Sequence, residues 1–258
     1  MYGECTMICA RCQHFEAAPG GTLCTQCAVA PEPEAPQFTA APVAWVRSPV
    51  GLGRTAAAVL GLVVVIDLFA IGAAMAVYDV AGDLVGGVSG VGERAERADS
   101  LYSSVGLLRT SVLLTCVVVF LCWFHRVRVN AEVFSPFGHA KKRGWAIGAW
   151  FVPIVNLWFP RRIALDIWDA SSPWDTPRSH GLVDAWWTLW LLSVLTNRAG
   201  SFAYRSSDTA EEIRGAVRQV LVADVVDAVA AVLAILVVLR LTRMQHEKVL
   251  RGPATAAF

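Results

Sequence analysis

The sequence has few charged residues and no recognisable catalytic motif. Only 17% of its residues are charged, whereas a soluble domain usually carries about 25%. A net charge of +1 gives no reason to expect nucleic acid as a partner. No Ser/His/Asp, Cys/His or HExxH arrangement is present, so we do not expect an enzyme. An internal repeat of fixed period is also lacking, and the first 50 residues contain no apolar run of signal-peptide length.

The scarce charge is matched by long apolar runs. Hydrophobic residues make up 55% of the chain, and four runs approach the roughly 20 residues that cross a bilayer core. These runs are residues 55–78, 107–124, 182–203 and 217–239. The third is the weakest because Asn197 and Arg198 interrupt it. The sequence therefore predicts an all-α multi-pass membrane protein whose main partner is the lipid bilayer.

Charge asymmetry favours four spans over five. A fifth apolar run, residues 145–159, is short and contains Pro153 and Asn156. If this run does not cross, 15 basic residues lie on the cytoplasmic side and 5 outside, but the split becomes 11 against 9 if it does. The positive-inside rule favours the first arrangement, with both termini cytoplasmic in a cytoplasmic membrane. Five spans, the fifth of them tilted, are the alternative.

The short run is rich in tryptophan and proline. Eight of the ten tryptophans lie between residues 145 and 190, and tryptophan prefers the headgroup layer of a membrane. We therefore expect residues 145–160 to form a short re-entrant or interfacial helix. The amphipathic stretch that follows, beginning with Arg161 and Arg162, is then expected along the inner membrane surface.

The N-terminal residues 1–30 form a separate cysteine-rich segment. Two CxxC pairs, Cys9/Cys12 and Cys24/Cys27, are separated by 11 residues that contain the turn sequence Pro-Gly-Gly. Two such pairs supply four thiolates to a tetrahedral zinc ion, so the pattern predicts a zinc ribbon with structural Zn²⁺. Iron in a similar knuckle and a disulfide pair are the alternatives. Neither Cys5 nor His14 is expected to be a ligand.

A site of four thiolates is closed and needs a reducing compartment. Both properties favour a structural module in the cytoplasm that binds a protein partner. Five prolines in residues 31–50 predict an extended linker between this module and the membrane domain. The helical membrane domain is expected over residues 51–251, followed by a tail at 252–258. The sequence leaves oligomerisation open.

Four charged residues are expected inside the apolar runs. Asp67 lies near the middle of the first run, Asp224 and Asp227 lie three residues apart in the last, and Arg109 is near the outer end of the second. An ionised side chain at the bilayer centre is unfavourable by about 3 kcal/mol, so such residues are paired or functional. One interpretation is an ion pair of Arg109 with Asp67 or Asp224 that fixes helix packing. The other is a proton or cation relay through the three acids.

The central segment resembles a known membrane family. The residues that carry the likeness are Trp150, Pro153, Asn156, Leu157, Trp158 and Pro160, in a W-x-x-P-x-x-N-L-W-x-P pattern. This pattern resembles the actinobacterial family catalogued as domain of unknown function 4328, in which many members carry an N-terminal zinc ribbon. The resemblance implies a bacterial inner-membrane protein over about residues 50–250, but no activity. We therefore expect a scaffold or sensor that presents its zinc ribbon to a partner, with a small transporter or ion pathway as the alternative.

Overall fold

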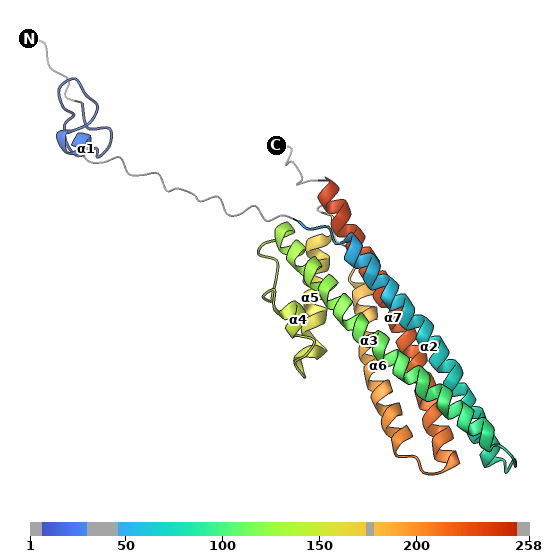
Figure 1. Ribbon diagram of the computed structural model, residues 1–258. Helices are drawn as coiled ribbons and strands as arrows, with labels where there is room; N and C mark the ends of the chain where they lie inside the picture. The colour runs from blue at the N-terminus through green and yellow to red at the C-terminus, as the bar shows by residue number, and fades with distance from the viewer. Residues whose placement is uncertain (1–6, 30–45, 174–177, 252–258) are drawn as a thin grey trace, which may run out of the picture. The chain divides into compact units, whose positions relative to one another are not determined.

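The computed structural model describes residues 7–29, 46–173 and 178–251, and the chain divides into two compact units, residues 1–44 and 45–258. The described part of the chain contains helices and no strand (Figure 1). Cys5, most of the proline-rich linker, Trp174 and the tail at 252–258 lie outside the described residues. The helical class predicted from the sequence is therefore confirmed for the part that is described.

The first unit is a small hairpin followed by one short helix. Ile8 and Glu16 form an antiparallel bridge, and the Cys9 N–H donates to the Phe15 carbonyl at 2.8 Å. The chain then turns at Gly20, whose φ of 81° suits glycine, and enters helix α1, Thr25–Val29. These turns bring the two CxxC pairs together.

The second unit contains three helices that are long and apolar enough to cross a membrane. They are α2, Val50–Val85, α3, Gly92–Phe134, and α7, Ala210–Arg251. The shortest, α2, has 36 residues and is about 54 Å long at 1.5 Å per residue. All three therefore extend beyond a hydrocarbon layer of about 30 Å.

A fourth helix, α6, Gly181–Arg205, lies along α7. The packing order is α3–α2–α7–α6, and neighbouring helices in this order run in opposite directions (Figure 1). Thr209 and Glu212 form a capping box at the turn between α6 and α7: the Glu212 N–H donates to Thr209 Oγ1 and the Thr209 N–H donates to Glu212 Oε2.

Small residues fill the contact between α2 and α7, while large apolar residues face outward. Leu62, Leu68 and Phe69 of α2 are about half or more exposed, at 47%, 59% and 67%. Alanine is the commonest residue at the buried positions of these two helices, namely at Ala56, Ala70, Ala73, Ala74, Ala81, Ala216, Ala223, Ala230, Ala231 and Ala234. Small residues inside and large ones outside are typical of helices that pack within lipid.

The tryptophan- and proline-rich run is not one continuous helix. It contains α4, Trp145–Gly148, a turn, the 3₁₀ helix η1, Val155–Leu157, and then α5, Phe159–Ser171. Ile154, before η1, has a φ of 67°, and Pro160 occupies the first turn of α5. Pro153 supplies no N–H for a longer helix. The run therefore lacks the continuous helix that a fifth span requires.

The environments of the tryptophans and of α5 differ from the expectation. Trp168, Trp186 and Trp187 are buried at 3% exposure each, and only Trp158, at 51%, is largely exposed among the described tryptophans of this segment. Helix α5 packs against α3, α6 and α7, so protein covers its apolar face. The physical reason is mutual packing of aromatic rings. Trp150, for example, lies 5.5 Å from both the Phe120 and Trp190 rings.

Gly53 permits a close contact of α2 with Thr242 of α7, and its substitution tests this contact. A Cβ at Gly53 would lie 2.3 Å from Thr242 Oγ1, whereas one at Gly51 meets nothing within 4 Å. We expect Gly53→Ala to destabilise the bundle by about 1–3 kcal/mol through overpacking. Gly51→Ala, at the start of the same helix, should be neutral or slightly stabilising. Thermal unfolding of both variants in detergent measures the difference, and equal midpoints would contradict the close approach.

Candidate functional sites

The four cysteines of the two CxxC pairs converge in the first unit. Their sulfur atoms all lie within 4.8 Å of one another, and the Cys12 and Cys24 sulfurs are 3.9 Å apart. A tetrahedral site with Zn–S bonds of about 2.3 Å has sulfur–sulfur edges of about 3.8 Å. A disulfide requires about 2.05 Å, and all four thiols are free. This donor set fits a metal ion bound by four thiolates.

Backbone N–H groups favour the thiolate form of Cys9, one of the four thiols of this site. The backbone N–H groups of Cys12 and Cys24 hydrogen bond to Cys9, and they lower the pKa of its thiol to about 6. The Cys27 N–H points to the Cys24 sulfur at 3.4 Å. His14 is not part of this cluster: its ring Nδ1 contacts the Cys12 carbonyl at 2.6 Å on the exposed side of the hairpin.

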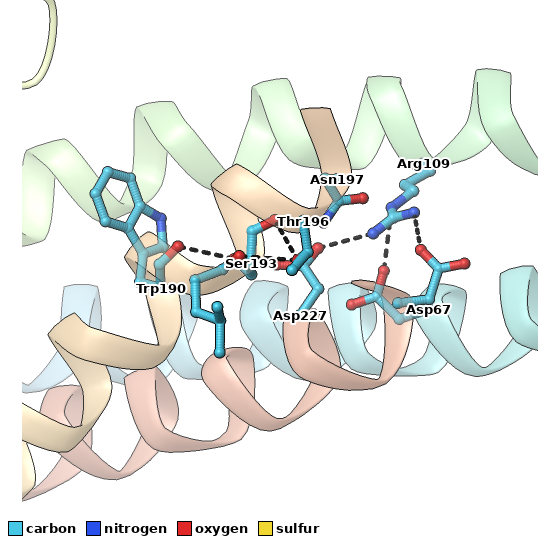
Figure 2. Close-up of polar contacts among 9 residues, drawn as sticks. Asp67, Arg109, Trp190, Ser193, Thr196, Asn197 and Asp227 are labelled. Atoms are coloured by element: carbon cyan, nitrogen blue, oxygen red, sulfur yellow. Dashed lines mark hydrogen bonds and ion pairs between the residues drawn. The ribbon is translucent and has the colours of Figure 1, made fainter. Parts of the chain in front are cut away.

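A second cluster joins three helices of the long bundle through Arg109. From α3, Arg109 donates to Asp224 at 2.6 Å and to Asp227 at 2.7 Å, both on α7. Its Nε also lies 3.2 Å from Asp67 Oδ1 on α2 (Figure 2). A planar guanidinium with five donors can serve three carboxylates at once. The structure thus brings together all four charged residues singled out in the apolar runs.

The charges in this cluster do not balance. Asp67 and Asp224 are buried at 0% and 1% exposure, while Arg109 and Asp227 reach 25% and 30%. One cation therefore faces three acids. Neither carboxylate oxygen of Asp67 has a hydrogen-bond partner among the described residues, although buried polar atoms are nearly always partnered. The cluster therefore links three helices through ion pairs and contains more acidic than basic groups.

The residues of the W-x-x-P-x-x-N-L-W-x-P pattern, at 150–160, and the two arginines that follow it lie in several environments. Trp150 packs in the aromatic core, whereas Trp158 is exposed and Pro160 is buried at the start of α5. Arg161 donates twice to Asp184 of α6, at 3.0 and 2.8 Å. Arg162 lies 3.3 Å from Asp166 on its own helix. Pro153 and Asn156 lie in the turn and in η1 between the two flanking helices.

Comparison with family models gives a match over residues 89–243 to the domain of unknown function DUF4328. The chain belongs to this family. No curated protein and no solved structure matches the chain. The matched residues include Arg109, Asp224 and Asp227 and the Trp/Pro pattern, while Asp67 and the four cysteines precede them. The resemblance inferred from the pattern is confirmed.

A buried polar network links α3, α5 and α7 at the end of the bundle opposite the Arg109 cluster. The sequence analysis did not predict this network. Asn130 donates to Gln245 Oε1 at 3.1 Å and to the Arg47 carbonyl at 2.8 Å. Gln245 donates in turn to the Val127 carbonyl at 2.8 Å and to Ser171 Oγ at 3.1 Å. The network ties the chain before α2 to α3, α5 and α7.

Lys248 extends this network. Its Nζ donates to the Ala170 and Ser172 carbonyls, at 2.8 Å each, at the end of α5. The sequence feature that could have predicted this network is the spacing of Thr242, Gln245 and Lys248, which lie three residues apart on one face of α7. Polar residues on the buried face of an apolar helix indicate contacts within the protein.

Proposed function

We propose that the chain is a membrane-anchored scaffold or sensor that holds a zinc-stabilised module in the cytoplasm for a protein partner. The observation that carries this proposal is the convergence of four free thiols in a unit separate from the long helices. A unit this small cannot bury a sufficient core, so bound zinc supplies much of its folding free energy. Four thiolates leave no open coordination position for catalysis, which favours a binding role.

The module also offers an apolar surface for a partner. Ile8 and Phe15, on the hairpin, are 65% and 59% exposed, as is neighbouring Met7 at 62%. Exposed large side chains of this kind are enriched at protein interfaces, most of all the aromatic ones. We assign the partner contact to these exposed apolar side chains of the hairpin.

Affinity capture of full-length protein after crosslinking in cells tests the proposal. Phe15→Ser should retain zinc and lose the captured partner, whereas Gln26→Ser, an exposed polar position on α1, should retain both. Double substitution of Cys9 and Cys12 by serine should lose zinc and partner together. An identical captured set for the parent protein and these three variants would overturn the proposed role.

We further propose that α6 is a fourth span and that both termini are cytoplasmic. Helix α3 ends and α7 begins at opposite ends of the bundle, and α6 connects them (Figure 1). If α3 and α7 both cross, α6 returns the chain across the same layer. Its 25 residues extend about 37 Å, which is sufficient for crossing. The positive-inside count supports the same orientation.

Cysteine labelling tests this topology. Ser179 and Ser206 are exposed and flank α6, whereas Ser172 is buried and unsuitable as a probe. Single cysteines at these two exposed positions, with Cys5, Cys116 and Cys122 removed, are probed in intact cells with a membrane-impermeant thiol reagent. We expect labelling at position 206 and protection at position 179. The reverse result would contradict the proposed orientation of α6, and equal labelling at both positions would place both ends of α6 on one side of the membrane.

A second candidate function is a small transporter or a proton or cation pathway through Asp67, Asp224 and Asp227. It is favoured by the ratio of one arginine to three acids and by the Asp67 oxygens, which accept no hydrogen bond from the described residues. An acid without a balancing cation in an apolar layer binds a proton or another cation. The packing role of the same residues is the competing explanation.

The substitution Asp67→Asn distinguishes the two. It keeps the size of the side chain and removes its charge, so a packing role predicts normal accumulation with a change in stability of at most about 1–2 kcal/mol. A relay predicts complete loss of proton or cation flux in proteoliposomes while the protein still accumulates. Flux that persists in the Asp67→Asn variant would refute the pathway. The exposed Asp79→Asn change, on the same helix, is the control.

A further inference from the structure

An apolar cavity of about 330 Å³ adjoins the Arg109 cluster. It is lined by residues of α2, α3, α6 and α7, and by Trp150 and Asn156 of the segment between α4 and α5. Aromatic rings of Phe120, Trp186 and Trp190 form much of its wall, and Asp227 brings a carboxylate to it. Cavities of this size, mostly apolar with a few polar groups, are typical of sites for small molecules.

Three polar groups in this wall call for a ligand that carries hydrogen-bond donors and a positive charge. Asn156 Oδ1 is buried and accepts no hydrogen bond from the described residues. Asp227 shares Arg109 with Asp67 and Asp224, so the cluster at this end of the cavity has more negative than positive groups. The Trp150 Nε1–H is likewise buried without a partner among the described residues, and it suits an acceptor atom elsewhere on the ligand.

Charge and aromatic surface together select the class of ligand. The excess of carboxylates would repel an anionic ligand. An uncharged apolar ligand would leave the excess negative charge without a counterion. A protonated amine is attracted to Asp227, and aromatic faces stabilise a nearby cation by about 0.5–2 kcal/mol each. We propose that this cavity binds a lipophilic amine in its protonated form, with the ammonium group toward Asp227 and the apolar body among the aromatic rings. The site requires neither metal in the cysteine module nor ion flux across the bundle.

Paired probes test the charge requirement. Phenylbutylamine, protonated at neutral pH, and the uncharged phenylbutanol have nearly the same size and shape. We expect saturable binding of the amine to the purified full-length protein in calorimetric titration, with a Kd at least about tenfold lower than that of the alcohol. Asp227→Asn should weaken amine binding about tenfold and leave alcohol binding unchanged, which also shows that the variant cavity is intact.

Matched substitutions on α3 test the location. Val117 lines the cavity at 40% exposure, whereas Val118, exposed at 63%, is not part of its wall. Val117→Phe should abolish binding of both probes, and Val118→Phe should change neither. Equal affinities for amine and alcohol would assign the cavity to uncharged lipid chains and overturn the proposal. Failure to bind the amine, or amine binding that is insensitive to both Asp227→Asn and Val117→Phe, would also overturn it.

Discussion

Replacing Arg109 with glutamine is expected to destabilise the helical bundle by about 3–5 kcal/mol, enough to prevent accumulation of the protein in membranes. The substitution removes the guanidinium of Arg109, which contacts Asp67, Asp224 and Asp227. Two of these acids are almost fully buried, so their charges would remain without a counterion in an apolar layer. Membrane accumulation and thermal unfolding in mild detergent measure the loss.

Two further variants separate the charge effect from a general effect of mutation. Arg97 pairs with Glu93 at the exposed start of α3, so Arg97→Gln should change stability by at most about 1 kcal/mol. Combining Arg109→Gln with asparagine at all three acids removes every charge of the cluster and should restore much of the stability. Normal accumulation of Arg109→Gln alone, or no recovery in the combined variant, would show that this cluster does not hold α2, α3 and α7 together.

The pairing of Arg109 with acidic residues could be predicted from the sequence, because a charged side chain inside an apolar helix is unfavourable without an oppositely charged partner. The sequence proposed Arg109 with Asp67 or Asp224, and the structure gives Arg109 both, together with Asp227. The convergence of all three acids was beyond prediction, since it depends on α2 and α7 packing as neighbours. Buried alanines and Gly53 allow α2 and α7 to pack closely. The role of these small residues becomes clear only when the two helices are seen side by side.

Helix limits and tryptophan positions were predicted less well, for two physical reasons. Hydropathy marks the lipid-facing part of a helix, whereas α3 and α7 continue through polar ends supported by pairs such as Arg97–Glu93 and Arg243–Glu247. Tryptophan suits both the headgroup layer and an aromatic core. The spacing of Val183, Trp186, Trp187 and Trp190 places them on one face of α6, and this period was the available sign of packing.

The second large effect is expected in the cysteine module, where substitution of Cys9 and Cys12 by serine should abolish metal binding. We expect the full-length protein to contain one zinc ion per chain, held by Cys9, Cys12, Cys24 and Cys27. Zinc binding to small four-ligand modules contributes about 10–16 kcal/mol, and most of this free energy is folding free energy. The variant should therefore lose zinc, and the hairpin around the site should become sensitive to protease.

Elemental analysis of the purified full-length proteins under reducing conditions measures this effect, with a second pair of cysteines as the matched control. Cys116 and Cys122 lie in α3 and are not among the four converging sulfurs, so their double substitution by serine should leave one zinc per chain. His14→Ala should also retain zinc, because its ring contacts the Cys12 carbonyl and is not among the four converging sulfurs. Stoichiometric iron, absence of metal, or zinc retained after loss of Cys9 and Cys12 would each contradict a structural zinc site of four thiolates. Zinc loss confined to the Cys9 and Cys12 variant would locate the metal where the two CxxC pairs meet, and would tie the folding of the module to that metal.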